Sequence, residues 1–245
     1  LEPPIVTFTG DSGNFTGTEN LDEFFLSGTA SGEGLGGDDI FELSGSATGV
    51  GGDGNDSIRS AGSSVADGGT GEDTLTATEN ATVAGGDGND NLSASDTGLA
   101  QGNAGNDSLS GTDQATLSGG EGNDTLGGRD QSVLSGGIGD DSFFAANTSA
   151  AFGDEGNDFI SAEDSSTADG GAGDDSIILR DSAQAIGGEG NDSITGFSSA
   201  TDTGGLQVDA GVGDDTLKLR GEYLGRAGTG NDLGRAAEDA TIRGG

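Results

Sequence analysis

The residues of this sequence whose type and spacing could do chemistry are aspartates that recur at a fixed interval. Twelve of them close Gly-rich stretches that follow the pattern Gly-Gly-x-Gly-x-Asp. The step from each aspartate to the next is seventeen positions, apart from one step of twenty-three between Asp192 and Asp215. The twelve are Asp39, Asp56, Asp73, Asp90, Asp107, Asp124, Asp141, Asp158, Asp175, Asp192, Asp215 and Asp232. A carboxylate that recurs in this way is suited to binding cations through hard oxygen ligands.

The constant period predicts how these aspartates are positioned. Fixed self-similarity over so many steps is typical of a solenoid. Outside the Gly-rich turn, small or apolar residues occupy alternate positions, as at Ala81 and Val83, which is the pattern of a strand with one buried face. The sequence therefore predicts an all-β fold, a parallel β-solenoid (β-roll or β-helix) of about thirteen 17-residue coils with right-handed crossovers. Stacked coils lie about 4.8 Å apart, so the predicted shape is a rod.

The ends of the chain differ from its middle, and we expect three parts. Residues 1–16 are more apolar and are predicted to cap the first coil. Residues 17–197 are the regular coils. Residues 198–245 contain the six-residue insertion, the last two coils and an Arg-rich end.

Stacking places each aspartate of the series beside the next, which is costly without a counter-ion. Two carboxylates about 4.8 Å apart repel by roughly 3.5 kcal/mol at an effective dielectric constant near 20. A marginally stable fold cannot absorb this repulsion at every coil. Glycine lets the backbone turn with its carbonyl oxygens directed inward. Carboxylates and carbonyls without nitrogen or sulfur ligands favour Ca²⁺.

The turns also resemble a known repeat. Gly51-Gly52-Asp53-Gly54-Asn55-Asp56 and the corresponding turns that end at Asp90 and Asp124 resemble the RTX, or hemolysin-type, calcium-binding nonapeptide. The resemblance implies a calcium-bound β-roll in which turn aspartates and carbonyls of neighbouring coils share each ion. It also implies type I export from a Gram-negative bacterium, with folding delayed until the chain meets external calcium.

The sequence departs from the RTX pattern in one respect. RTX β-rolls use two nonapeptides per 18-residue coil, whereas each coil here has one such turn. We therefore expect a single column of roughly eleven calcium ions, similar to the one-sided calcium solenoids of bacterial adhesins. A second series shares one repeat position on the opposite edge, where it indicates either a further cation column or residues that cap turns through their own backbone. Its members are Asp96, Asp113, Asp130, Asp164 and Asp181.

Composition excludes several classes of function. The chain has no Cys and no His, so it offers no thiol nucleophile and no imidazole base, and we expect no catalytic residue and no enzyme. Its 44 acidic and 8 basic residues give a net charge of −36, which disfavours nucleic acid as a partner. No apolar run is long enough to span a membrane.

Three functions remain. The first is a stiff, calcium-dependent structural module of a secreted or cell-surface protein, such as an adhesin, a surface layer or a filament. The second is ice binding by a flat solenoid face. The third is an RTX accessory module of a secreted enzyme. Besides calcium, the expected partners are a second copy bound end to end or a surface glycan.

Overall fold

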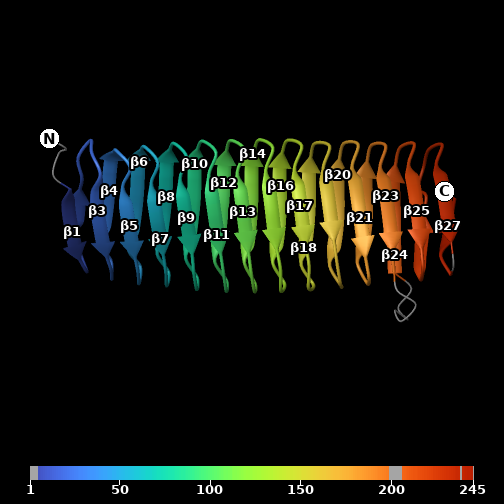
Figure 1. Cartoon of the computed structure of the whole chain (residues 1–245), viewed down its shortest axis with the longest axis horizontal. Helices are drawn as coiled ribbons and strands as arrows, with labels where there is room; N and C mark the ends of the chain where they lie inside the picture. Colours follow the sequence, from blue (N-terminus) through green and yellow to red (C-terminus); the bar gives the residue numbers. More distant parts are fainter. Residues whose placement is uncertain (1–4, 199–205, 238, 245) are drawn as a thin grey trace. The chain divides into compact units, whose positions relative to one another are not determined.

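The computed structural model describes residues 5–198, 206–237 and 239–244. These residues form strands and turns, and no helix occurs among them. The described residues therefore include no helix that could cross a membrane. The chain divides into two compact units, residues 1–122 and 123–245. In each unit the odd-numbered strands form one sheet, called sheet A, and the even-numbered strands form another, called sheet B (Figure 1).

Unit 1 contains seven strands of each sheet. Sheet A consists of β1 (Val6–Gly10), β3 (Asp22–Leu26), β5 (Ile40–Leu43), β7 (Ser57–Ser60), β9 (Thr74–Ala77), β11 (Asn91–Ala94) and β13 (Ser108–Gly111). Sheet B consists of β2 (Asn14–Thr16), β4 (Ser31–Gly36), β6 (Thr48–Asp53), β8 (Val65–Thr70), β10 (Thr82–Asp87), β12 (Leu99–Ala104) and β14 (Thr116–Glu121).

Unit 2 repeats this arrangement. Its sheet A consists of β15 (Thr125–Gly128), β17 (Ser142–Ala145), β19 (Phe159–Ala162), β21 (Ser176–Arg180), β23 (Ser193–Phe197), β25 (Thr216–Arg220) and β27 (Leu233–Ala237). Its sheet B consists of β16 (Val133–Ile138), β18 (Ala150–Glu155), β20 (Thr167–Ala172), β22 (Gln184–Glu189), β24 (Leu206–Val212), β26 (Tyr223–Arg226) and β28 (Thr241–Arg243).

Within each unit, every strand pairs in parallel with the strand of the same sheet in the next coil. The register follows the sequence period, so that Leu92 lies opposite Leu109 in sheet A and Val83 lies opposite Ala100 in sheet B. The register is also kept across the 23-residue step, where Ala185 lies opposite Val208. The predicted all-β parallel solenoid of 17-residue coils is therefore confirmed.

The number of coils differs from the expected thirteen. The described residues of each unit form seven strands of each sheet, which makes fourteen coils in all. The additional coil lies in the segment expected to cap the solenoid, where β1 pairs with β3 and β2 pairs with β4. The division of the chain into cap, regular coils and C-terminal end stays a prediction, as does the right-handed crossover. The six-residue insertion is expected around residues 198–203, and all of it except residue 198 lies outside the described residues.

The core lies between the two sheets and is thin. From β3 to β25 a column of large apolar residues points inward from sheet A, and in the first coils the rings of Phe24 and Phe41 stack with centroids 4.3 Å apart. At the next inward position of sheet A, the size of the side chain is complementary to that of the facing residue of sheet B. Leu43 fills the space beside Gly49, whereas Leu117 fills the space beside Gly111. A small residue on one sheet thus faces a large one on the other, which keeps the interior packed.

Candidate metal centre

Each aspartate of the predicted column follows a Gly-rich turn that joins a strand of sheet B to the next strand of sheet A. In one coil, β6 ends at Asp53, the turn passes through Gly54, and Asp56 directly precedes β7. Gly54 has a φ of +136°, and a Cβ at this residue would overlap the carbonyl oxygen of Gly37 in the preceding coil. Only glycine allows the backbones of stacked turns to come this close.

The structure brings the predicted aspartates together in one column within each unit, with their side chains in the interior. Asp232, in the last coil of sheet A, is half-buried. The other eleven are at most 2% exposed and are Asp39, Asp56, Asp73, Asp90, Asp107, Asp124, Asp141, Asp158, Asp175, Asp192 and Asp215. Asp22 belongs to the same column and is fully buried, although its turn lacks the glycines of the motif. The sequence signal that identifies Asp22 as a member of the column is its position one 17-residue period before Asp39.

One oxygen of each carboxylate holds the column in register. The backbone N–H of Asp39 donates to Oδ1 of Asp56 at 2.6 Å, and the N–H of Asp56 donates to Oδ1 of Asp73 at 2.7 Å. The same bond crosses the 23-residue step, where the N–H of Asp192 donates to Oδ1 of Asp215 at 2.8 Å. The side chain of each of these aspartates is thereby linked to the backbone of the preceding coil.

The second carboxylate oxygen has no such partner. In nine aspartates the Oδ2 atom is buried and accepts no hydrogen bond from the described part of the chain. These are Asp39, Asp56, Asp73, Asp90, Asp141, Asp158, Asp175, Asp192 and Asp215. An unpartnered buried carboxylate oxygen is costly, so its repetition coil after coil points to a missing positive partner.

The surroundings of this oxygen consist of further oxygens. A Cβ added to Gly51 would overlap both Oδ2 of Asp56 and the carbonyl oxygen of Gly68 in the next coil. The same pair of oxygens, one carboxylate and one carbonyl, surrounds Gly68, Gly153 and Gly170. Glycine at the first motif position therefore leaves room for the inward carboxylate beside a backbone carbonyl.

These residues fit a calcium ion. The donors are all oxygen, are repeated in every turn and include backbone carbonyls, which suits a hard cation with flexible coordination. Among the described residues no group of three or more acidic, His or Cys side chains forms a cluster. Backbone carbonyls would therefore have to supply part of each coordination shell. Bound calcium would supply the positive charge that the column lacks.

The pKa values of the column aspartates also indicate that their negative charges are not compensated. Burial, together with the charges of neighbouring aspartates, raises the pKa of Asp56 to about 6 and that of Asp73 to about 7. The hydrogen bond from the preceding N–H acts in the opposite direction. Other members are raised to about 6 or about 7 for the same reasons, namely Asp39, Asp90, Asp141, Asp158, Asp175 and Asp192.

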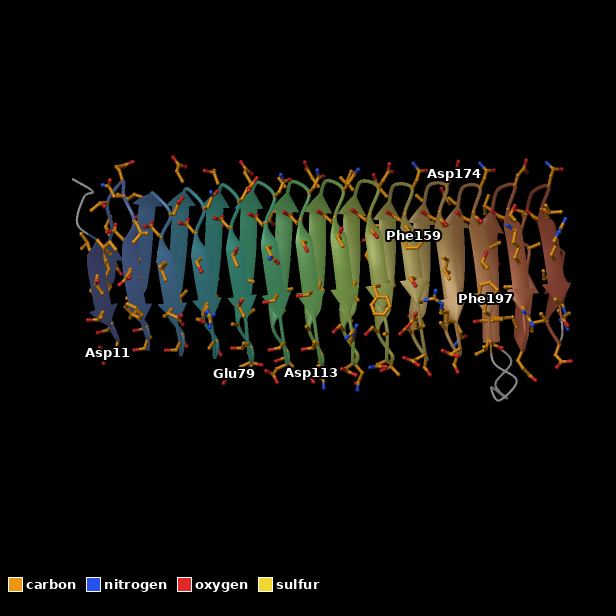
Figure 2. The ribbon with its side chains drawn as sticks, in the orientation of Figure 1. Asp11, Glu79, Asp113, Phe159, Asp174 and Phe197 are labelled. Atoms are coloured by element: carbon orange, nitrogen blue, oxygen red, sulfur yellow. The ribbon has the colours of Figure 1, made fainter. Side chains whose placement is uncertain are left out.

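A second ladder on the outside of the same turns was not predicted. In most turns the residue before the column aspartate accepts a backbone N–H of the next coil, so that Asp174 Oδ1 accepts from the N–H of Asn191 at 2.7 Å and from its Nδ2 at 2.9 Å. Figure 2 labels Asp174 at this edge. In unit 2 the ladder alternates between the two residue types, as Asp140, Asn157, Asp174, Asn191, Asp214 and Asn231. Alternation with Asn limits the negative charge beside the buried column.

The series on the opposite edge is better explained by the backbone. Asp96 and Asp113 have φ of +59° and +64°, and in the first coils the same position is occupied by Gly28, Gly45 and Gly62 with similar φ. Figure 2 labels Asp113 at these exposed turns. Asp and Asn tolerate this left-handed conformation, which favours a turn-forming role. Asp130, Asp164 and Asp181 share it, and a second cation column stays a hypothesis.

Three turns depart from the motif without losing its conformation. Leu35, Asn103 and Asp154 replace the second glycine and keep a positive φ of 80°, 81° and 74°. Ala210 and Ala227 replace the first glycine and are buried. Their methyl groups lie at the position that glycine leaves open for the carboxylate, so we expect weaker cation binding at these two turns.

We predict that Gly51→Ala removes one calcium site. The new methyl group would displace Oδ2 of Asp56 while the backbone stays in an ordinary conformation, and overpacking of this kind costs roughly 1–3 kcal/mol. Calorimetric titration should show about one ion fewer, and urea unfolding in calcium should show a lower midpoint. Gly127→Ala is the matched control, because no atom lies within 4 Å of its added Cβ. Equal behaviour of the two variants would contradict the site.

We also predict that the metal-free solenoid loses stability as the pH rises from about 4 to about 7. The folded-state pKa of Asp73, Asp141 and Asp175 is about 7 against an ordinary value of 3.8, so the folded chain binds more protons throughout this window. Circular dichroism of protein stripped of divalent ions should show more β-structure at the acidic end.

The control for this prediction separates the column from the general surface charge. Replacing Asp73, Asp141 and Asp175 with Asn should weaken the pH dependence. Replacing the exposed Asp53 and Asp87 should leave it almost unchanged. A metal-free chain that is most ordered at neutral pH would be incompatible with an uncompensated column.

Comparison with known proteins supports the fold. No protein-family model matches the sequence, and no curated protein matches it. Among solved structures, the chain is similar to a hyperactive, Ca²⁺-dependent, β-helical antifreeze protein from an Antarctic bacterium, determined by X-ray crystallography. The TM-score is 0.63 at 23% identity, over 95% of this chain and 84% of that one. At this identity the similarity shows a shared β-solenoid fold.

Proposed function

We propose that this chain is a calcium-dependent β-solenoid whose buried aspartate column binds a row of Ca²⁺ ions. The observation that carries the proposal is the repeated Oδ2 atom that is buried beside a backbone carbonyl and has no hydrogen-bond partner, as in Asp56. The solved structure with a similar fold is that of a Ca²⁺-dependent protein, which supports the choice of ion. The twelve predicted aspartates are the proposed side-chain ligands, and Asp22 is added to them.

The role we propose for this solenoid is structural. The turns resemble the RTX nonapeptide, which supports a secreted or cell-surface location in a Gram-negative bacterium and folding in external calcium. A uniform array of coils suits a stiff segment of an adhesin, a surface layer or a filament. The sequence has no His and no Cys, and we propose no catalytic role for it. An RTX accessory module of a secreted enzyme is the variant of this role in which catalysis belongs to other sequence.

We predict that removing calcium unfolds the solenoid. Because the ions bind the folded column and not the unfolded chain, their binding free energy contributes directly to stability. Circular dichroism at neutral pH should change from β-structure to disordered chain when EGTA is added, and it should recover with excess Ca²⁺. Magnesium at the same concentration is the control and should not restore the spectrum. A spectrum that EGTA leaves unchanged would exclude the proposal.

Ice binding is the second candidate, and one feature of sheet B favours it. An outward column in unit 1 alternates between Thr and aliphatic residues at neighbouring strands, in register. Its members are Thr48, Val65, Thr82, Leu99 and Thr116. The similar solved structure is that of an antifreeze protein. In sheet A the outward positions of unit 1 are less regular, from Ile40 through Ser57 and Thr74 to Asn91.

A thermal-hysteresis measurement in calcium tests this candidate. If sheet B binds ice, the wild-type chain should depress the freezing point below the melting point. Thr82→Lys, at the centre of the column, should remove most of this activity because a long charged side chain disrupts the flat face. Thr74→Lys on sheet A is the matched control and should retain the activity. Absence of hysteresis in the wild-type chain would exclude ice binding but would not contradict calcium binding by the aspartate column.

A further inference from the structure

We propose that the outer face of sheet A in unit 2 binds an acidic polysaccharide, a sugar polymer that carries carboxylate or sulfate groups. The first observation is where acidic residues are missing. The sequence contains 44 of them, yet none lies in the seven strands of this sheet, from β15 to β27. Seven of the eight basic residues belong to unit 2. An anion can therefore approach this face although the chain as a whole is strongly negative.

The second observation is a cationic groove at β23, β25 and β27. It is open, has a volume of about 610 Å³, and is lined by Thr195, Phe197, Lys218, Arg220 and Arg235 among others. Lys218 and Arg235 are exposed and lie directly opposite each other in register. Like charges at opposite positions of a sheet are unfavourable. Neither forms an ion pair with a described acidic residue, so a bound anion would stabilise the pair.

The third observation is the set of aromatic and hydroxyl side chains that sheet A presents on the same face beside this groove. Phe159 in β19 and Phe197 in β23 are 41% and 50% exposed, and Figure 2 labels both. Their strands are two steps apart, or about 10 Å. Phe159 is in register with Ser193, four residues before Phe197, so the two rings lie toward opposite ends of their strands. The hydroxyl groups of Ser176 and Thr195 belong to outward positions of the same sheet. Exposed aromatic rings can pack on the apolar faces of sugars, while hydroxyl groups can exchange hydrogen bonds with sugar hydroxyls.

These features favour a sugar polymer over nucleic acid. A nucleic acid carries a dense row of phosphates, and its binding depends on many cationic contacts. Here the groove offers three cationic side chains, and the protein as a whole has a net charge of −36. This negative charge would repel such a dense polyanion. A polysaccharide has fewer charges, separated by neutral hydroxyl-rich rings. Its pattern matches a face on which cations lie at β25 and β27, while the preceding strands present aromatic and hydroxyl side chains and Arg180 is paired with Glu163.

Binding of the full chain in calcium to immobilised hyaluronate and chondroitin sulfate tests the proposal, with neutral dextran and single-stranded DNA as comparison surfaces. We expect binding to at least one of the two acidic polymers and none to neutral dextran. Lys218→Ser with Arg235→Ser should weaken it at least about tenfold, the effect of one lost charge-assisted hydrogen bond. Phe197→Ser should weaken it without changing the net charge.

Arg226→Ser with Arg243→Ser is the matched control. These two residues also lie opposite each other in register, but in sheet B of the same unit, so the change in charge and spacing is equal. This variant should bind as the wild type does, and circular dichroism should show that all variants keep the solenoid. The proposal is overturned by absence of binding to both acidic polymers, by an equal loss in the sheet B variant, or by stronger binding to DNA.

Discussion

The structure depends on how a column of buried carboxylates is compensated. Between the first and the last coil, each coil places one aspartate in the interior. In the regular coils one of its oxygens accepts a backbone N–H and the other faces a backbone carbonyl. A hydrogen bond to one oxygen lowers the pKa, but burial and the neighbouring charges outweigh it. Neutralisation must therefore come from protons or from metal ions. At neutral pH a divalent cation is the partner that suits an all-oxygen site.

Other features of the fold follow from this arrangement. The core is too thin to stabilise the chain through apolar burial alone, since hydrophobic residues make up 29% of the sequence. Ion binding at each turn would provide the missing free energy, and the glycines that leave room for it also prevent the turns from forming helices. Because each Asp side chain bonds to a neighbouring coil, stability is shared between nearest neighbours, as in other solenoids.

Much of this could be predicted from the sequence because the information is periodic. The period of the aspartates gave the coil length, and the alternation at Ala81 and Val83 gave the strands. The number of coils was underestimated, because Val6–Gly10 and Asn14–Thr16 lack the Gly-rich signature and were interpreted as a cap. The outer Asn and Asp ladder was missed because its residues resemble ordinary turn formers, and only the coordinates reveal their hydrogen bonds between coils. The identity of the ion cannot be read from the backbone and rests on the chemistry of the donors.

The 23-residue step shows that the solenoid can accommodate additional residues. Six extra residues precede Asp215, yet its bond to Asp192 has the same length as its counterpart between Asp158 and Asp175. The strands on either side also stay paired. The turn after β23 thus tolerates an insertion without a change in the lattice of coils. A solenoid of this kind can gain peptide epitopes or whole functional loops at such turns, and it can be lengthened or shortened by complete coils, through small genetic duplications and deletions.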